Sequence, residues 1–281
     1  MSSSQVKIEL GNGAFSYIHS LTPRPDNGQH RLYLLKRYQL YYLISGSVDY
    51  QIEGKSYRLL PGDLLIFNSK ELHRPYFTSD ESYERILIFF KPEFCRYYNS
   101  PGYNLLQYFE RKKPGSFNRL PSSIVKNVNI QAYFDEIEYL GREEEPQNPL
   151  LIELTFIRLL VEVNQLISSY DSPDEPILDH HEELDQMINY IHDHLSDNLS
   201  LDDMENKFHM NKYYFSHLFK KTMGVSFKQY VLHKRLSKAA EMLKLDVPPS
   251  EAARLSGFVD YSNFYKAFTK WTGVTPSKFN G

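Results

Sequence analysis

The chain has 281 residues, of which 41% are hydrophobic and 24% charged, so it is long enough for two domains that each bury a core. Its one cysteine excludes an internal disulfide and a cysteine-rich zinc site, and its formal net charge of −3 is not what a nucleic-acid-binding protein usually shows. No stretch approaches the roughly 18 apolar residues of a membrane helix and no signal-peptide run opens the chain, so we expect a cytoplasmic protein without membrane contact.

Residues from about 5 to 92 have the pattern of short β-strands. The run Leu40–Ile44 is apolar and aromatic, and the residues Val48–Glu53 alternate between apolar and polar. Turn signals at Gly46-Ser47, Gly54-Lys55 and Pro61-Gly62-Asp63 separate these strands from their neighbours. Many short strands at this spacing predict a small barrel or sandwich, which we assign to residues 1–120.

Residues 121–170 change to a helical period. Apolar side chains form two stripes along one helix; the first is Ile152, Phe156, Leu159, Leu160, Val163, Leu166 and Ile167, and the second is Leu150, Leu154, Ile157 and Val161. Because both stripes must be buried, we predict that one packs on the barrel and the other on a second copy of the chain, together with a helix at about 124–140. The alternative is that one subunit covers both stripes.

Residues 171–183 contain six acidic residues, two prolines and no Lys or Arg, which predicts an exposed linker. The pair His180-His181 has no partners nearby at metal-ligand spacing, so we predict no metal site there. The linker separates the N-terminal part from a C-terminal domain at residues 184–281.

One pattern occurs twice in this C-terminal domain, at an offset of 49 residues. Two phenylalanines four residues apart are followed by a glycine, and the copies comprise Phe215, Phe219 and Gly224, and Phe264, Phe268 and Gly273. In each copy the aromatic pair marks the buried stripe of a short helix, which the glycine ends. A second short helix precedes each copy, so we predict two helix-turn-helix units.

Helix start signals support these units. They are the capping-box pairs Ser200 with Asp203 and Ser226 with Gln229, the caps Asn211 and Asp260 before the two recognition helices, and Thr275-Pro276. Between the units, residues 227–245 form a predicted helix whose inward positions are Tyr230, Val231, Leu232, Leu236, Ala239, Ala240 and Leu243. As a rigid spacer, this helix would place the two units in major-groove segments about one helical turn (34 Å) apart.

The basic charge of the chain is concentrated on the repeat. Residues 206–281 contain 13 Lys and Arg but 4 Asp and Glu, as contact with phosphates requires, although a solvated basic surface gives the same signal. The outward face of the two recognition helices carries the predicted DNA-contacting residues Lys212, Tyr213, Ser216, His217, Lys220, Lys221, Tyr261, Ser262, Tyr265 and Lys266. Hydroxyl and imidazole groups suit base edges, and lysines suit phosphates; Trp271, at a helix end, is predicted to pack.

Residues 184–281 resemble the DNA-binding domain of the AraC/XylS family of bacterial transcription activators. The resemblance rests on Gly257-Phe258-Val259-Asp260 with Phe264, Phe268, Gly273 and Pro276, and on Arg235-Leu236 with Ala239 and Leu243 in the connecting helix. The sequence departs from the family pattern at Glu205, where a small residue is usual, so the first unit is expected to bind more weakly.

The N-terminal stretch is similar to the cupin-type sensing domain of the same family, through Tyr38–Gly46, Leu60–Phe67 and Glu71-Leu72-His73. The resemblance implies an α+β multidomain protein with an effector-binding barrel, a helical dimerisation segment and a double helix-turn-helix domain. It also implies activation through RNA polymerase, controlled by a small metabolite such as a sugar. By analogy, Arg31, Tyr33 and His73 are candidates for the effector pocket.

Two alternatives remain open. A regulator controlled by a partner protein, or active constitutively, would have a barrel that senses nothing. A cupin enzyme would need several histidines and a carboxylate around a metal, and only His73 stands at such a position, so we predict no enzyme activity, no metal and no cofactor.

Overall fold

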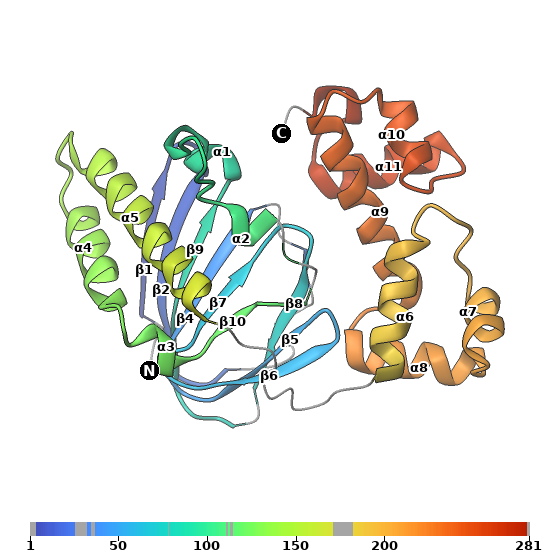
Figure 1. Ribbon diagram of the computed structural model, residues 1–281, viewed down its shortest axis with the longest axis horizontal. Helices are drawn as coiled ribbons and strands as arrows, with labels where there is room; N and C mark the ends of the chain where they lie inside the picture. Colours follow the sequence, from blue (N-terminus) through green and yellow to red (C-terminus); the bar gives the residue numbers. More distant parts are fainter. Residues whose placement is uncertain are drawn as a thin grey trace. The chain divides into compact units, whose positions relative to one another are not determined.

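The structure of the chain is a computed structural model that describes residues 4–25, 33–34, 37–77, 79–110, 112, 115–170 and 182–279. The chain divides into two compact units, Met1–Asp179 and His180–Gly281. The first contains β-sheets with flanking helices, and the elements described in the second are helices (Figure 1). This architecture confirms the predicted α+β fold class, with a β-rich N-terminal unit and a helical C-terminal one.

The N-terminal unit contains two antiparallel sheets, one of six strands in the order β1-β2-β9-β4-β7-β10 and one of four in the order β3-β8-β5-β6. The strands are β1 Ser4–Leu10, β2 Phe15–Thr22, β3 Tyr33–Leu34, β4 Tyr38–Ser45, β5 Val48–Ile52, β6 Lys55–Leu59, β7 Leu64–Phe67, β8 Leu72–Tyr76, β9 Tyr83–Phe90 and β10 Arg119–Leu120. The three turn signals of the sequence fall between consecutive strands from β4 to β7, so the predicted strand pattern is confirmed.

The two sheets share a core. It contains aromatic and aliphatic side chains from both sheets, namely Tyr41, Leu43, Val48, Tyr50, Ile52, Tyr57, Leu59, Leu65, Phe67, Phe77 and Tyr83. Within the described residues the sheets are not hydrogen-bonded into one closed barrel. The arrangement is therefore an open, sandwich-like form of the predicted barrel.

The buried carboxylate of Asp63 connects three segments of the N-terminal unit. It accepts hydrogen bonds from the backbone N–H of Leu60 at 2.8 Å and of Ser122 at 2.7 Å, and it pairs with the Arg119 guanidinium at 2.9 Å. These contacts attach β10 and the start of the helical segment to the turn between β6 and β7. Removing one partner of such a pair would leave a buried charge unpaired.

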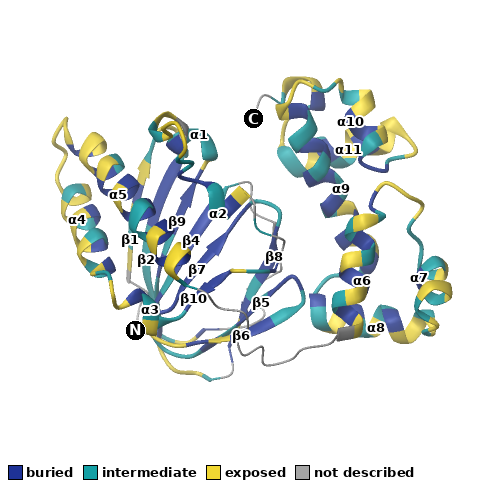
Figure 2. Cartoon of the chain, viewed as in Figure 1, coloured by how far each residue is buried: buried dark blue, intermediate teal, exposed yellow. Residues whose placement is uncertain are grey.

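Helices cover the outer face of the six-stranded sheet. Those of the N-terminal unit are α1 Pro92–Cys95, the 3₁₀ turn Arg96–Tyr98, α2 Gln107–Glu110, α3 Ser122–Val125, α4 Ile130–Arg142 and α5 Asn148–Ser169. All seven residues of the first predicted stripe on α5 are buried, and Figure 2 shows the buried side of α5 turned toward the sheet. Phe156, for example, packs on Phe15 and Phe90 at ring-centroid distances of 5.0 and 4.9 Å.

The second stripe of α5 is buried only in part. Ile157 is buried and Val161 half-buried, whereas Leu150 and Leu154 are 56% and 41% exposed, so the N-terminal unit does not cover this stripe at its beginning. The single helix predicted at about 124–140 is instead two helices, α3 and α4, because the chain turns at 126–129 before a new helix begins after Asn129.

The C-terminal unit consists of the helices α6 Glu182–Asp193, α7 Leu201–Phe208, α8 Lys212–Met223, α9 Phe227–Lys244, α10 Pro249–Leu255 and α11 Tyr261–Thr272, followed by the 3₁₀ turn Pro276–Lys278. Helix α9 is the predicted connecting helix, with α7 and α8 at one end and α10 and α11 at the other (Figure 1). At 18 residues and 1.5 Å per residue it is about 27 Å long.

The prediction of an inward position on α9 is wrong for one residue. Leu232 is 38% exposed, although the other six positions are buried. It lies one turn before Leu236, the first residue of α9 in the core of the second helix-turn-helix unit.

Most of the predicted linker, residues 171–181 with His180-His181, lies outside the described residues, and its last two residues already belong to α6. Within the described part of the chain, no helix has both the length and the apolar character needed to cross a membrane.

Candidate nucleic-acid interface

The first helix-turn-helix unit is formed by α7 and α8. The Ser200 and Asp203 capping box is present at the start of α7, and the Asn211 side chain accepts hydrogen bonds from the N–H groups of Tyr213 and Tyr214 at the start of α8. Gly224, with φ of 72°, ends α8 in the left-handed conformation that glycine adopts most easily. The predicted start and end of this recognition helix are therefore confirmed.

The second unit, α10 and α11, repeats the arrangement. The Asp260 side chain accepts a hydrogen bond of 2.7 Å from the N–H of Asn263, and Gly273, with φ of 80°, ends α11. Both recognition helices have 12 residues and bury the predicted pair of phenylalanines. Trp271 packs edge-on against Phe268, as predicted from its place at the helix end.

The predicted contact residues lie on the outward faces of α8 and α11. Tyr213 is 76% exposed, and exposed or partly exposed side chains follow it at helical spacing along α8, namely Ser216, His217, Lys220 and Lys221. On α11 all four predicted side chains are exposed, namely Tyr261, Ser262, Tyr265 and Lys266. The structure thus brings each set together on one face of a helix, where polar side chains can reach base edges in a groove.

Lys212 differs from the other lysines of α8. Its ammonium group donates a hydrogen bond of 2.7 Å to the carboxylate of Asp202 on α7, which raises the pKa of Lys212 above its usual value. Among the described residues, no carboxylate pairs with Lys220 or Lys221. The sequence pattern did not reveal this difference, because Asp202 lies ten residues before Lys212.

Tyr214 was missed by the sequence analysis. It is 58% exposed beside Tyr213, at the end of α8 that carries the Asn211 cap. The sequence signal for its exposure is its position directly before Phe215, the first phenylalanine of the repeat, which points into the core.

Among the effector candidates, His73 is the one whose side chain the structure describes. It is fully buried, its Nδ1 lies 2.9 Å from the carbonyl oxygen of Glu71, its Nε2 lies 3.1 Å from Oε1 of Gln39, and its ring stacks on Phe67 at 3.9 Å. Burial lowers the pKa of His73 to about 4, so the ring is neutral at neutral pH. Arg31 lies outside the described residues, and so does the side chain of Tyr33.

A row of side chains next to His73 was also missed. Ser16, Phe89, Gln39 and Phe67 are direct neighbours across β2, β9, β4 and β7, so they lie on the same face of the sheet. The Arg37 guanidinium lies 5.0 Å from the Phe89 ring and donates a hydrogen bond of 2.7 Å to Ser16. Register, which the sequence does not give, places these residues together.

The Gln39 side chain contains an unsatisfied polar atom. Gln39 is fully buried, and among the described residues its Nε2 has no hydrogen-bond partner. Because a neutral His73 offers only one N–H, which Glu71 accepts, turning the Gln39 amide would satisfy His73 but leave Oε1 without a partner. Within the described residues, no group of three His, Cys, Asp or Glu side chains could hold a metal ion.

Two capped helix-turn-helix units on one connecting helix, each with a polar outward face on a basic segment, define a DNA-binding protein. The comparisons with known proteins agree with the geometry. A model of the AraC-like ligand binding domain matches residues 25–160, and a model of a helix-turn-helix domain matches residues 204–281. The chain therefore combines an AraC-like ligand-binding domain with a helix-turn-helix domain, and its relatives include AraC/XylS-type transcriptional regulators.

Individual relatives match one part of the chain or nearly all of it. The regulatory protein PocR of Salmonella typhimurium is 37% identical over 101 residues, which are 36% of this chain and 33% of PocR. The arabinose operon regulatory protein of Escherichia coli is 26% identical over 275 residues, which are 93% of this chain and 88% of that protein. The chain spans between 12% and 37% of the length of four curated relatives, PocR among them.

Among solved structures, ToxT from Vibrio cholerae with an unsaturated fatty acid bound is 16% identical to this chain, with a TM-score of 0.41. The match covers 97% of this chain and 97% of ToxT.

Proposed function

We propose that the chain is a cytoplasmic transcriptional activator that binds operator DNA through α8 and α11 and responds to a small metabolite bound in its N-terminal unit. In this proposal it acts as a homodimer, contacts RNA polymerase at its target promoters and catalyses no reaction. The observation that carries the DNA-binding part is the duplication of an exposed polar face on two helices of equal length with matching caps.

The side chains of these faces have different tasks. We assign base contacts to Tyr213, Ser216 and His217 on α8, and to Tyr261, Ser262, Tyr265 and Lys266 on α11, because their donors and acceptors point away from the core. We assign phosphate contacts to Lys212, Lys220 and Lys221, which lie at the two ends of α8.

Selection of bound sites from random duplexes, followed by footprinting of the full chain, tests this assignment. We expect two protected segments about one helical turn apart on one side of the duplex. His217→Ala and Lys266→Ala should weaken binding to the selected site more than to random DNA, because they remove base contacts. Protection of a single segment, or equal losses on selected and random DNA, would contradict the proposal.

For the effector we propose a hydroxylated metabolite such as a sugar, bound on the inner face of the six-stranded sheet. Support comes from the row of Arg37, Ser16, Phe89 and Gln39, in which charged and hydroxyl groups adjoin an aromatic ring and an unsatisfied amide. Aromatic rings stack on sugar faces, while guanidinium and amide groups hydrogen-bond hydroxyls.

A thermal-shift screen with sugars and related metabolites tests the effector. A ligand at about 100 times its Kd would stabilise the protein by about 2.7 kcal/mol, and Arg37→Met should abolish the shift. The alternative is a regulator controlled by a partner protein, favoured by the core of eleven buried side chains that fills the space between the sheets. A screen without any hit would support that alternative.

For the homodimer we propose that α5 packs on α5 of a second copy. Leu150, Leu151 and Leu154 are 56%, 40% and 41% exposed on neighbouring turns at the beginning of this helix. Full burial of a leucine is worth about 1.5–3 kcal/mol, so six such half-exposed leucines would contribute roughly 6 kcal/mol. Association costs on the order of 4–15 kcal/mol, so other residues of this face must contribute as well.

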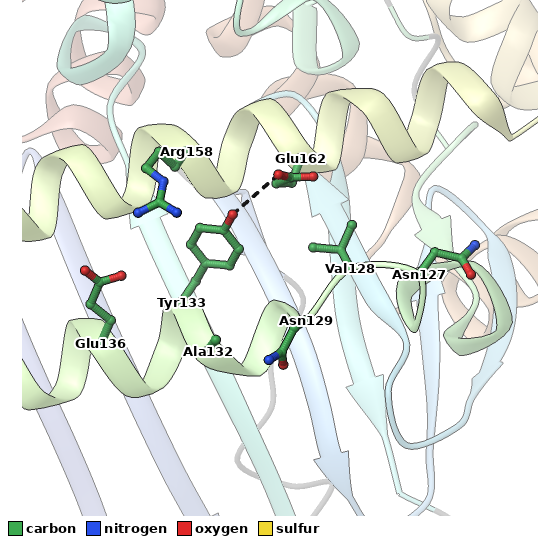
Figure 3. A pocket seen from close by; sticks show the side chains of 8 residues that line it. All are labelled: Asn127, Val128, Asn129, Ala132, Tyr133, Glu136, Arg158 and Glu162. Atoms are coloured by element: carbon green, nitrogen blue, oxygen red, sulfur yellow. Dashed lines mark hydrogen bonds between the residues drawn. The ribbon is translucent and has the colours of Figure 1, made fainter.

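A groove between α4 and α5 is lined mainly by polar side chains. It forms a pocket of about 330 Å³ in which Tyr133 of α4 lies between Arg158 and Glu162 of α5 (Figure 3). The guanidinium of Arg158 lies 5.5 Å from the Tyr133 ring, and the Tyr133 hydroxyl donates a hydrogen bond of 3.5 Å to Glu162. Together with Glu136, Arg158 and Glu162 provide charges of both signs that a two-fold related copy can match.

Analytical ultracentrifugation tests the dimer. The wild-type chain should sediment as a dimer, and the double variant Leu150→Glu and Leu154→Glu as a monomer, because the glutamates would be buried unpaired. Leu60→Glu, at an exposed leucine of the turn between β6 and β7, is the matched control and should remain dimeric. A monomeric wild-type chain, or a dimeric double variant, would exclude this interface.

A further inference from the structure

The turn after α6 contacts the connecting helix α9 and the second helix-turn-helix unit. Residues Leu195–Asp197, which we call the brace, connect α6 to the segment before α7. From α9, the Arg235 Nε donates a hydrogen bond of 3.0 Å to the carbonyl oxygen of Leu195, and its Nη2 donates one of 2.6 Å to that of Asp197. One guanidinium thus holds both ends of the brace.

The second unit also contacts the brace. The Ser196 hydroxyl donates a hydrogen bond of 2.8 Å to the carbonyl oxygen of Leu255 at the end of α10, and accepts one of 2.8 Å from Lys238 of α9. Gly257 follows with φ of +90°, and a Cβ there would lie 2.5 Å from the carbonyl oxygen of Leu195. The turn between α10 and α11 therefore lies against the backbone of the brace.

The brace itself is attached to the first unit through α6. The Nε2 of His192 lies 2.9 Å from the hydroxyl of Tyr230 near the beginning of α9, and the ring of Tyr190 packs edge-on against Phe208 of α7 at 5.6 Å. Through α6, the brace is therefore linked to α7 and to the beginning of α9.

Among the described residues, a long hydrogen bond of 3.8 Å from the Ser256 hydroxyl to the Met242 sulfur and an apolar core also attach the second unit to α9. Leu236, Ala239, Ala240 and Leu243 of α9 pack against Ala252, Ala253, Phe264 and Phe268 of the second unit. Apolar contacts are not directional, so this core allows small rotations of the unit around α9 at little cost. Hydrogen bonds are directional, and those to the brace are placed to prevent such rotations.

We propose that the brace, with Arg235 as its positioning residue, fixes the orientation of α11 relative to α8 and thereby the spacing of the two DNA segments that the protein accepts. This inference rests on the proposed function, since it requires both recognition helices to contact one duplex. Inserting one base pair between the segments shifts them by about 3.4 Å and rotates them by about 34°. A rigid pair of helices cannot follow this change, whereas a pair without the brace can.

The test uses the full chain and the duplex that the wild-type protein selects from random DNA. Versions of that duplex with one base pair inserted or deleted between the protected segments measure a spacing penalty. For the wild-type protein we expect a penalty of about tenfold or more in Kd, comparable to the loss of a base contact. Arg235→Met, which keeps the length of the side chain but not its donors, should reduce the penalty to about threefold or less.

Two further variants separate the brace from general effects. In Gly257→Ala the added Cβ would lie 2.5 Å from the carbonyl oxygen of Leu195 and 2.8 Å from the Arg235 Nε, so it should displace this contact and also reduce the spacing penalty. Lys228→Met, which removes an exposed charge from α9, should weaken binding to all duplexes equally and keep the wild-type penalty. Circular dichroism and thermal denaturation establish that each variant is folded.

The outcomes distinguish the brace from the proposed function. If folded Arg235→Met and Gly257→Ala proteins keep the wild-type spacing penalty, the brace does not set the spacing. If the wild-type protein selects no site with two segments, the proposed function itself is wrong, and the inference is wrong with it. A merely structural role of Arg235 would lower the thermal stability without changing the penalty.

Discussion

Replacing Lys220 and Lys221 by methionine should flatten the salt dependence of DNA binding, whereas replacing Lys212 should change it less. In the described residues, Lys220 and Lys221 lack a carboxylate partner, so their ammonium groups can displace counterions from DNA directly. Lys212 is already 2.7 Å from Asp202. If Lys212 binds a DNA phosphate, it must leave Asp202, and the Asp202 carboxylate then attracts a cation from solution. This uptake cancels part of the counterion release from DNA.

The size of the effect follows from the number of phosphate contacts. Each contact contributes about 0.9 to the slope of log K against log salt, so a fourfold rise in salt weakens binding about 3.5-fold per contact. Without Lys220 and Lys221, the loss of affinity over that range should be about twelvefold smaller than for the wild-type protein. For Lys212→Met the difference should be clearly below 3.5-fold, although the same charge is removed.

Fluorescence anisotropy on a random-sequence duplex, at several salt concentrations, measures these slopes. Lys126→Met, at an exposed lysine of the N-terminal unit, is the matched control and should leave the slope unchanged. If Lys212→Met flattened the slope as much as Lys220→Met, the Asp202 contact would have no influence on binding. An unchanged slope for the double variant would refute the phosphate assignment itself.

Three further predictions concern stability. The N-terminal unit should be most stable above pH 6.5 and lose about 3 kcal/mol of its free energy of unfolding as the pH falls to about 4. The reason is that His73 binds a proton in the unfolded chain over this pH range, whereas buried His73 stays neutral. In His73→Gln, urea denaturation should show a correspondingly smaller loss. Asp260→Ala should destabilise the C-terminal unit by about 1 kcal/mol in thermal denaturation, while Asn263→Ala, which keeps the cap, should have a smaller effect. Phe156→Ala should cost about 3–5 kcal/mol in urea denaturation, and a loss below about 1 kcal/mol would contradict its place in the core.

The helix-turn-helix units could be predicted in detail because their signals are local. A cap such as Asn211 or Asp260 acts on N–H groups two or three residues away, and Gly224 and Gly273 end their helices by their own backbone conformation. The exposed faces follow from the helical period once the phenylalanines are placed. These features require no knowledge of the rest of the fold.

Features that depend on contacts between distant segments could not be predicted. The brace is held through backbone carbonyls, which every residue has, so no residue type marks Leu195 or Asp197. Leu232 has the same sequence signal as Leu236 and is exposed because the second unit does not extend to it. The row around Gln39 depends on strand register, which the hydrophobic pattern does not determine between the strands of this sheet.

The connectivity of the six-stranded sheet has a consequence for folding kinetics. Strand β2 pairs with β9, so Phe15 pairs with the distant Phe90. Strand β10 pairs with β7, although two strands and several helices lie between them in the sequence. The helical unit, in contrast, forms most of its contacts between consecutive helices. Because high contact order slows folding, the part of the chain synthesised first should reach its native state later than the part synthesised last, and it is the part that depends more on protection from aggregation meanwhile.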